Sequence, residues 1–496
     1  MDPPLDNTRH LRYWQRCLRT LLPHQYTSND STRMTLGCFA VAAVDLLSPS
    51  GSPSGSGSGS PPILSTADRR RYRAWVLACQ HPGGGFAGGP THVYPPAAYD
   101  GLNFGTGQPA VGAPGEANIA ATLFALQLLA LVADESSSSE SSSSAAAAFA
   151  GVDRAATLRW LRRLQRPDGS FGEFLAEVAD PAAPGGRRCF VAGGADMRYC
   201  YIAAAIRWML RGAVDDGGDG GDGDAKTRKA GWVEDIDVDA LVRYIRGSQT
   251  YDGGFSESAT HESHGGYAFC AIAALSLLER AQQGAPPQSA TNSIFARGIA
   301  DMPALLRWLS ARCFRYAPPG DDDDEVEDEA ESLVTGVTPA ALLRPETHPF
   351  LGFNGRCNKH ADTCYTWWTM GALTILARSG AVTVVDNHAV AAPWKPCRRF
   401  LLEQTQHGIG GFAKGPGGPP DVYHSYLGLA ALATRGEPGL RAFDPAVCVS
   451  SATVATIEAA RDGLLRGAGA RGAARRDQLL QLGRACWGAN GVAVVV

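Results

Sequence analysis

The sequence lacks a hydrophobic run long enough to cross a membrane. Its most apolar stretch, IAATLFALQLLALVA from Ile119, is shorter than the roughly 20 residues that a membrane helix needs. The first residues, MDPPLDNTRHLRYWQRC, also lack the apolar centre of a secretory signal. We therefore expect no membrane span and a cytoplasmic location.

The chain also lacks an excess of charge and a disulfide pattern. Its 45 Lys and Arg nearly balance its 49 Asp and Glu, for a net charge of -4, so we expect no general affinity for nucleic acid or acidic membranes. The 12 cysteines in 496 residues stand singly, often within helical patterns such as AFCAIAAL. We expect most of them to be reduced, buried thiols.

Four stretches contain too few apolar residues to bury a face. They are rich in Ser, Gly or acidic residues and lie at about 48–62, 134–148, 213–230 and 318–334. We expect disordered insertions on the surface of a single domain, 1–496, because the same pattern resumes after each one.

That pattern is a repeat in which a Gln is followed, at a fixed offset, by a Gly-containing turn and a Phe. The pairs are Gln80 and Phe86, Gln165 and Phe171, Gln249 and Phe255, and Gln406 and Phe412. A fifth copy, GFNG at 352–355, keeps only the Gly-Phe. Each copy follows an amphipathic helix, and most precede a helix rich in Ala and Leu. Such stacked hairpins predict an all-α fold: an α/α barrel if the array closes, or an open solenoid if it does not.

Asp362 and Cys364 are two positions apart in NKHADTCYTWWTM, a segment rich in aromatic residues. Zinc accepts carboxylate oxygen, thiolate sulfur and imidazole nitrogen, and a catalytic zinc keeps one position open. Residues at i and i+2 do not share a helix face, so the pair should lie in a loop or first helical turn. His424, at the corresponding place in the next repeat, is the candidate third ligand. By spacing alone, Asp362 could equally cap a helix and His424 could be a core histidine.

Cationic and aromatic residues surround this candidate site. Arg356 and Lys359 precede Asp362 in a Gly-containing loop, where two cations could bind phosphate oxygens or form an ordinary solvated pair. His264 occupies the equivalent position one hairpin earlier. Aromatic residues begin the apolar helices: Tyr201, Tyr267, Trp367 and Trp368. A cationic mouth above an aromatic cavity suits an amphiphile with an anionic head and a long apolar tail.

These segments carry a family resemblance. GRCNKHADTCYTWW, ESHGGYAFC, ADMRYCY and GGFAKGPGGPPDVYHSY together resemble the β subunits of the CaaX protein prenyltransferases. RYWQRCLRTLLPHQYTSNDSTRMTLGCFA resembles the first hairpin of the type I geranylgeranyl class. The resemblance covers nearly the whole chain outside the four insertions.

The resemblance implies specific site residues. One catalytic Zn²⁺ would be bound by Asp362, Cys364 and His424, with Tyr365 beside it. The diphosphate would be held by His264, Arg356, Lys359, Tyr365 and Lys414. The isoprenoid and peptide pocket would be lined by Thr35, Phe39, Arg198, Tyr201, Tyr267, Cys270, Trp368, Tyr423 and Leu427.

The resemblance also implies the reaction and the partners. A cysteine thiol of a C-terminal CaaX motif, as in small GTPases, would take the open zinc position, lose its proton and attack an allylic diphosphate. The chain would act as the catalytic β subunit of a heterodimer with a prenyltransferase α subunit.

Three positions bear on the class of enzyme. Thr35 and Leu427 stand where the farnesyl enzyme has a bulky Trp and Tyr, which leaves room for the longer geranylgeranyl group. Lys414 stands where the farnesyl and Rab enzymes have Asp, so we expect that Mg²⁺ is not required. These positions favour type I, with geranylgeranyl diphosphate as donor and acceptors ending in Leu or Phe. Tyr423 departs from this pattern, since it resembles the farnesyl enzyme, and leaves the acceptor selectivity open.

Other interpretations remain. The chain could be a farnesyltransferase or Rab geranylgeranyltransferase β subunit. The Gln-Gly repeat also resembles triterpene cyclases, and Asp321–Asp324 could be mistaken for their aspartate-rich motif, although a cyclase needs neither Cys364 nor zinc. A non-catalytic helical toroid is the third alternative, and metal content would distinguish it.

Overall fold

The computed structural model describes residues 3–27, 29–48, 63–90, 116–133, 141–179, 182, 187–212, 231–280, 293–316, 349–381 and 394–466. The insertions expected at 213–230 and 318–334, and nearly all of that at 48–62, lie outside these residues. The insertion expected at 134–148 includes a helix, α5 (Ser141–Ala146), which packs against α17 (Ser451–Arg466). The expectation extended too far here because the run ends in alanines, which favour a helix.

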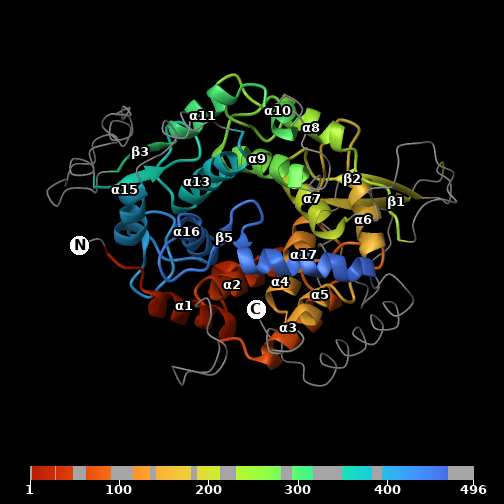
Figure 1. Ribbon diagram of the computed structural model, residues 1–496, viewed down its shortest axis with the longest axis horizontal. Helices are drawn as coiled ribbons and strands as arrows, with labels where there is room; N and C mark the ends of the chain where they lie inside the picture. Colours follow the sequence, from red (N-terminus) through yellow and green to blue (C-terminus); the bar gives the residue numbers. More distant parts are fainter. Residues whose placement is uncertain are drawn as a thin grey trace.

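Two concentric rings of helices form an α/α barrel, as predicted (Figure 1). Within the described residues the outer ring comprises α1 (Asn7–Arg19), α3 (Thr66–Ala78), α6 (Arg154–Arg163), α8 (Val238–Gly247), α11 (Met302–Ser310) and α15 (Trp394–Arg399), which continues into the π-helical turn η8 (Phe400–Thr405). The inner ring comprises α2 (Arg33–Leu46), α4 (Ile119–Leu131), α7 (Met197–Leu210), α9 (Gly265–Arg280), α13 (Thr363–Arg378) and α16 (Val422–Thr434). Inner helices are apolar nearly all round because most of their faces are covered by neighbouring helices.

Shorter elements complete the fold. They are η1 (His24–Tyr26), η2 (Asp30–Thr32), α10 (Ile294–Gly298) and three antiparallel strand pairs: β1 (Phe174–Ala179) with β2 (Arg187–Ala192), β3 (Cys313–Arg315) with β4 (Leu351–Phe353), and β5 (Phe443–Asp444) with β6 (Val449–Ser450). In register, Phe174 pairs with Ala192, Cys313 with Phe353 and Phe443 with Ser450.

The repeated Gln joins each hairpin to the next. Gln165 Nε2 donates to the carbonyl of Asp237 at 2.8 Å, and its Oε1 accepts the Asp237 N–H at 2.7 Å. Asp237 is the N-cap of α8, so the amide holds the start of the next outer helix. The repeated Phe residues are all fully buried: Phe86, Phe171, Phe255 and Phe412. The motif therefore encodes contact between repeats.

A glycine in the turn permits this contact. Gly169 has a φ of 93°, and a Cβ there would lie 2.2 Å from the carbonyl oxygen of Ala240 in α8. Gly253 has a φ of 97°, and a Cβ there would lie 2.5 Å from the carbonyl oxygen of Ala304 in α11. A side chain at either position would clash with the backbone of the next repeat.

The array closes, which settles the choice between barrel and solenoid. Inner helix α16 packs against α2. In the outer ring, Nδ1 of the buried His10 in α1 accepts a hydrogen bond from the Gly411 N–H at 3.1 Å. The imidazole proton is therefore on Nε2, which donates to Gln406 Oε1 at 3.0 Å. The last Gln of the series is thus bound by the first outer helix.

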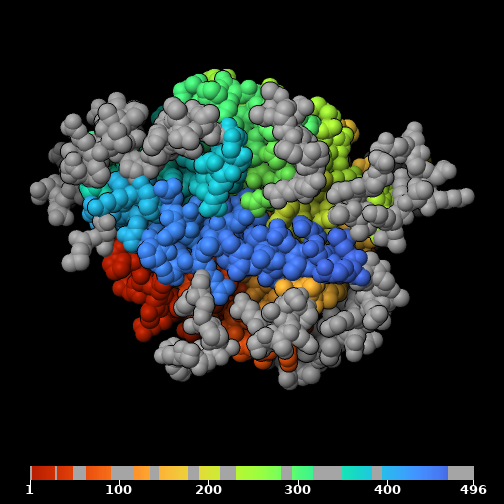
Figure 2. Space-filling model, viewed as in Figure 1, coloured from red at the N-terminus to blue at the C-terminus, as the bar shows by residue number. Residues whose placement is uncertain are grey.

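The carboxyl ends of the inner helices are covered by residues 443–450, which we term the floor, and by α17. Tyr201, Gln127 and Tyr426 donate hydrogen bonds to the backbone carbonyls of residues 446–448 at 3.1, 2.7 and 2.6 Å. Figure 2 shows α17 and the residues before it, in blue, lying across the middle of this face. The floor leaves the opposite end, where the inner helices begin, as the mouth of the barrel.

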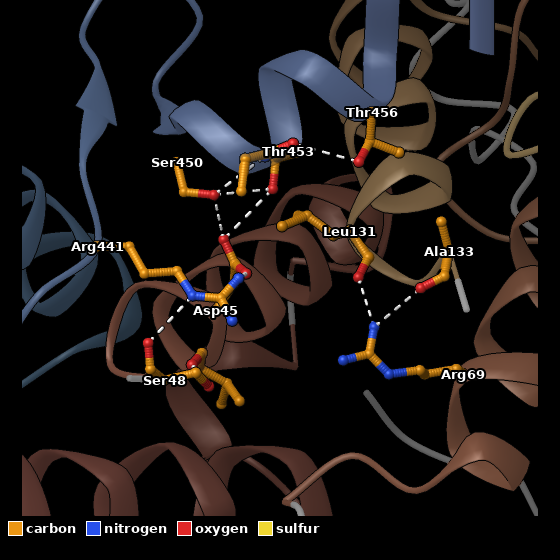
Figure 3. Close-up of polar contacts among 11 residues, drawn as sticks. Asp45, Ser48, Arg69, Leu131, Ala133, Arg441, Ser450, Thr453 and Thr456 are labelled. Carbon is orange, nitrogen blue, oxygen red and sulfur yellow. Dashed lines mark hydrogen bonds and ion pairs between the residues drawn. The ribbon is translucent and has the colours of Figure 1, made fainter. Parts of the chain in front are cut away.

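Asp45, near the end of α2, ties the floor to the inner ring (Figure 3). Its carboxylate accepts a hydrogen bond from Arg441 at 2.6 Å, from Ser450 at 2.5 Å and from Thr453 at 3.3 Å. These contacts join the first inner helix to the segment that follows the last one.

A candidate zinc and diphosphate site at the mouth of the barrel

Side chains of one kind begin several inner helices. Asn118, Asp196, Asp362 and Asp421 are the N-caps of α4, α7, α13 and α16, and each accepts a backbone N–H of its own helix. Because the inner helices all begin at the mouth, the positive ends of their dipoles lie there together, which favours an anionic ligand.

Asp362, Cys364 and His424 converge at this end. Their candidate ligand atoms all lie within 4.8 Å of one another. Asp362 Oδ1 accepts the Cys364 N–H at 2.8 Å and lies 3.3 Å from His424 Nε2. Asp362 therefore caps α13 with one oxygen and also faces the histidine, so the two functions considered from the sequence are compatible. Cys364 lies in the first helical turn, as expected.

Asp421 orients His424. Its Oδ1 accepts the His424 backbone N–H at 2.9 Å, and its Oδ2 lies 2.6 Å from His424 Nδ1. A neutral imidazole with its proton on Nδ1 presents the Nε2 lone pair to Asp362 and Cys364. A carboxylate behind a ligating histidine is the usual outer partner in zinc sites.

The charges at this site fit a cation. Burial lowers the pKa of His424, but hydrogen bonds to Asp362 and Asp421 outweigh burial and raise it to about 9. Burial, followed by the charge of Asp362, raises the pKa of the Cys364 thiol well above its usual range. Two carboxylates and a thiol around one imidazole therefore offer a surplus of acceptors, and an oxygen, sulfur and nitrogen ligand set suits zinc.

The backbone of Lys414 lies beside the candidate ligands. Its carbonyl accepts the Thr363 N–H at 2.9 Å, and the Ala413 carbonyl accepts Thr363 Oγ1–H at 2.6 Å. These two hydrogen bonds hold the last Gly-rich loop against the first turn of α13, at the residue between Asp362 and Cys364. The Lys414 side chain is exposed.

Tyr365 and His264 form a second pair at the mouth. His264 Nδ1 accepts the Gly266 N–H at 3.0 Å, so its Nε2 carries the proton and donates to the Tyr365 hydroxyl at 2.8 Å. Burial, with the charges of Arg356 and Arg198, lowers the pKa of His264 to about 4. At neutral pH His264 is therefore uncharged, and the Tyr365 O–H is free to donate to a ligand.

Two of the predicted cations, Arg356 and Lys359, lie on one loop, residues 355–359. Arg356 is half-exposed and pairs with Glu262 at 3.0 Å, and Lys359 is exposed. Gly355 lies against Tyr365, where a Cβ would come within 2.2 Å of the ring, and its carbonyl accepts the Gly265 N–H at 2.8 Å. The loop is thus fixed against the His264 and Tyr365 pair.

The predicted lipid-facing residues divide into two groups. Arg198 is half-exposed, binds Asp196 and lies 5.9 Å from the Tyr267 ring centroid, so both belong to the mouth. Tyr201 and Cys270 are buried deeper, with Tyr201 reaching the floor.

The remaining pocket residues lie on α2, α13 and α16. Trp368 donates Nε1–H to the Tyr423 hydroxyl at 3.2 Å. Phe39 stacks on Tyr426 with ring centroids 4.9 Å apart and lies 6.3 Å from Tyr423. Thr35 is half-buried and Leu427 is 1% exposed, so Thr35 is the more accessible of the two positions expected to limit lipid length.

Sequence reasoning missed Asp421 and Asp196. Both are N-caps. The sequence signal for Asp421 was its position three residues before His424, because a carboxylate at that spacing can contact both the backbone N–H and the imidazole of the histidine. Asp196 binds the Arg198 guanidinium in the same way, two positions along.

Comparisons with known proteins identify the family of the chain. The sequence matches the prenyltransferase alpha-alpha toroid domain family over residues 5–449. The Arabidopsis thaliana geranylgeranyl transferase type-1 subunit beta is 26% identical over 450 residues, covering 89% of this chain and 88% of that protein. The Pyricularia oryzae protein farnesyltransferase subunit beta is 26% identical over 443 residues, covering 87% of this chain and 63% of that protein.

A solved structure shares the fold. The Candida albicans protein geranylgeranyltransferase-I complexed with GGPP superimposes with a TM-score of 0.61 at 22% identity, covering 92% of this chain and 99% of that chain. Among the described residues, every helix is too short or too polar to serve as a membrane span. The chain belongs to the prenyltransferase alpha-alpha toroid family and is similar, over most of its length, to the β subunits of protein prenyltransferases.

Proposed function

We propose that the chain is the catalytic β subunit of a zinc-dependent protein geranylgeranyltransferase type I. It would transfer a geranylgeranyl group from geranylgeranyl diphosphate to the cysteine of C-terminal CaaX motifs, in complex with an α subunit and in the cytoplasm. The observation that carries the proposal is the convergence of Asp362, Cys364 and His424 at the mouth, with Asp421 orienting the histidine.

The described side chains suit the separate parts of this reaction. Zinc held by Asp362, Cys364 and His424 would lower the pKa of an acceptor thiol in its open position. The Tyr365 hydroxyl, held by His264 Nε2–H, would donate to the departing diphosphate. Arg356, Lys359 and Lys414 supply positive charge near the same helix N-termini, where it would stabilise the leaving group.

Donor length is the part of the proposal that depends on single positions. Thr35 is half-buried on the inner helix α2, and a threonine there leaves space that a tryptophan would fill. Geranylgeranyl exceeds farnesyl by one isoprene unit. At about 0.8 kcal/mol per buried CH₂, five further carbons contribute on the order of 3 to 4 kcal/mol if the space accepts them.

A farnesyltransferase is the second candidate, and Tyr423 is the observation that favours it. This residue is 37% exposed, and its hydroxyl accepts a hydrogen bond from Trp368, so it would contact an acceptor peptide that enters the mouth. A smaller aliphatic residue would be expected there in the type I class.

The test is to co-purify the chain with a prenyltransferase α subunit and measure transfer. Farnesyl and geranylgeranyl diphosphate would be compared on peptides that differ only in a terminal Leu, Phe, Ser or Met. We expect kcat/KM to be highest for geranylgeranyl diphosphate with Leu or Phe. Preference for farnesyl diphosphate with Ser or Met would reassign the chain to the farnesyl class.

A further inference from the structure

Among the described residues, Arg312 is a buried cation without a carboxylate partner. It follows α11, is 6% exposed, and its guanidinium lies 4.8 Å from the Trp308 ring centroid. Its Nε and Nη1 have no hydrogen-bond partner, and it forms no ion pair with any described residue. Because a buried charge without an anion is costly, these two nitrogens point to an anionic or strongly polar oxygen ligand.

The remaining nitrogen contacts a thiol. Arg312 Nη2 donates to Cys357 Sγ at 3.3 Å, and Cys357 is exposed. The contact is braced by the backbone, since the Asn354 N–H donates to the Arg312 carbonyl at 3.0 Å and Asn354 Nδ2 donates to the Lys359 carbonyl at 3.0 Å. Two nitrogens of the guanidinium are therefore buried, while the cysteine that the third one contacts is an exposed residue.

This arrangement suits oxidation of the sulfur. A guanidinium stabilises the negative charge on a cysteine sulfur that attacks an oxidant. In the reaction with hydrogen peroxide, the sulfur attacks one peroxide oxygen, an S–O bond forms and the O–O bond breaks. The sulfur loses two electrons and the peroxide is reduced to water, which leaves a sulfenic acid. The new oxygen can accept hydrogen bonds that Arg312 cannot give to any described residue.

We propose that Cys357 is a site of reversible oxidation by hydroperoxides, at which Arg312 binds the oxygen gained by the sulfur. The reverse reaction uses two thiols. The first displaces water from the sulfenic acid to give a mixed disulfide, and the second releases Cys357 as a thiol with one small disulfide as product.

The location gives the modification a consequence that rests on the proposed function. Cys357 lies between Arg356 and Lys359, on the loop expected to hold the diphosphate. An oxidised, partly anionic sulfur there would partly neutralise the positive charge of the loop and would accept hydrogen bonds from Arg312. Binding of the isoprenoid diphosphate should therefore weaken.

The chain contains a matched control thiol. Cys189 in β2 is also exposed and receives a hydrogen bond from an arginine, Arg163 Nη2, at 3.1 Å. Arg163 is itself exposed, so water can accept hydrogen bonds from its guanidinium in place of another oxygen ligand. Proximity to an arginine is shared by the two sites, and burial of the arginine distinguishes them.

The experiment measures sulfenic acid formation at each cysteine of the full chain. The protein is treated with hydrogen peroxide, trapped with a dimedone probe and analysed by mass spectrometry. We expect Cys357 to be labelled at least tenfold faster than Cys189, and an excess of small thiol before trapping to remove the label. The conservative variant Arg312→Lys should bring the two rates within about threefold. Equal labelling of Cys357 and Cys189 in the wild type would overturn the proposal.

A second pair of variants tests the anion preference without oxidant, should Arg312→Lys fold poorly. Cys357→Asp places a carboxylate beside Arg312, whereas Cys357→Asn is the neutral match. We expect a melting temperature at least 2 °C higher for the Asp variant, and equal values for the two would contradict a role for Arg312 in binding an oxyanion. In the complex with the α subunit, peroxide should raise the KM for geranylgeranyl diphosphate in the wild type and not in Cys357→Ser. Since labelling and melting do not depend on turnover, they distinguish failure of this proposal from failure of the proposed function.

Discussion

Replacement of Asp421 by Asn should weaken zinc binding while leaving the helix intact. In the wild type the two carboxylate oxygens have separate tasks, because one accepts the His424 N–H at 2.9 Å and the other faces His424 Nδ1 at 2.6 Å. Asparagine has one oxygen. If that oxygen keeps the cap, the amide NH₂ faces Nδ1, and the imidazole proton must move to Nε2, the atom that should bind the metal.

The magnitude follows from these two tasks. Asn is as good an N-cap as Asp, so the start of α16 should be retained, and the metal-free protein should lose only the ion pair between Asp421 and the His424 imidazolium, whose pKa is raised to about 9. Loss of an outer carboxylate partner typically weakens metal binding 10- to 100-fold, which corresponds to about 1.4 to 2.8 kcal/mol. We therefore expect a 10- to 100-fold loss of zinc affinity in a protein whose α16 is still capped.

The assay is competition for zinc against a fluorescent chelator, with thermal unfolding of the metal-free chain measured in parallel. Asp301→Asn provides the control, because Asp301 caps α11 through the Ala304 N–H at 2.8 Å and lies outside the candidate metal ligands. The control should bind zinc like the wild type. An unchanged zinc Kd in Asp421→Asn would refute the reasoning that this carboxylate sets the tautomer of His424.

Three further changes test other parts of the site. Thr35→Trp should shift the ratio of kcat/KM for geranylgeranyl over farnesyl diphosphate at least tenfold toward farnesyl, because a rigid aromatic ring fills the space for the last isoprene unit. The ratio is measured with one Leu-terminated peptide, and an unchanged ratio in the folded variant would exclude Thr35 as a length determinant. Lys414→Asp should slow turnover and make it respond to millimolar Mg²⁺, since a carboxylate recreates a site for a hard cation, whereas strong Mg²⁺ dependence of the wild type would contradict the role given to the ammonium. Burial, together with nearby Arg356 and Arg198, holds the pKa of His264 at about 4 in the folded chain against 6.5 normally, so the unfolded chain binds the proton first as pH falls. The wild type should therefore lose stability relative to His264→Gln between pH 6.5 and about 4, and parallel melting curves for the two proteins across that window would show that His264 is not held neutral.

The architecture could be predicted because its cause is local and repeated. The Gln-to-Phe spacing recurs because each Gln amide must reach the next helix start, as Gln165 does with Asp237, and that requirement is visible in sequence. Closure of the ring was harder to predict, because it depends on a contact between His10 and Gln406, which are far apart in the sequence. Pattern alone could not choose between a barrel and a solenoid.

The convergence of the candidate ligands could be predicted from the sequence, but the residues that position them were harder to predict. Few residue types bind zinc, so the candidates could be chosen from the sequence. They converge as expected: Asp362, Cys364 and His424. Asp421 was missed because an aspartate before a helix has a sufficient explanation as a cap. The charge of His264 was left open by the sequence, because its low pKa results from burial and from Arg356 and Arg198, which are distant in sequence.

The central claim is that Asp362, Cys364 and His424 hold a metal that takes the acceptor thiol. Its most direct test is the absorption spectrum of the complex with the α subunit, loaded with Co²⁺ in place of zinc, before and after addition of a Leu-terminated CaaX peptide. We predict that the sulfur-to-cobalt charge-transfer band of the Cys364 thiolate is present at the start and gains the intensity of one further thiolate when the peptide is added. A band that does not change with saturating peptide, or that persists in Cys364→Ala before the peptide is added, would contradict the account.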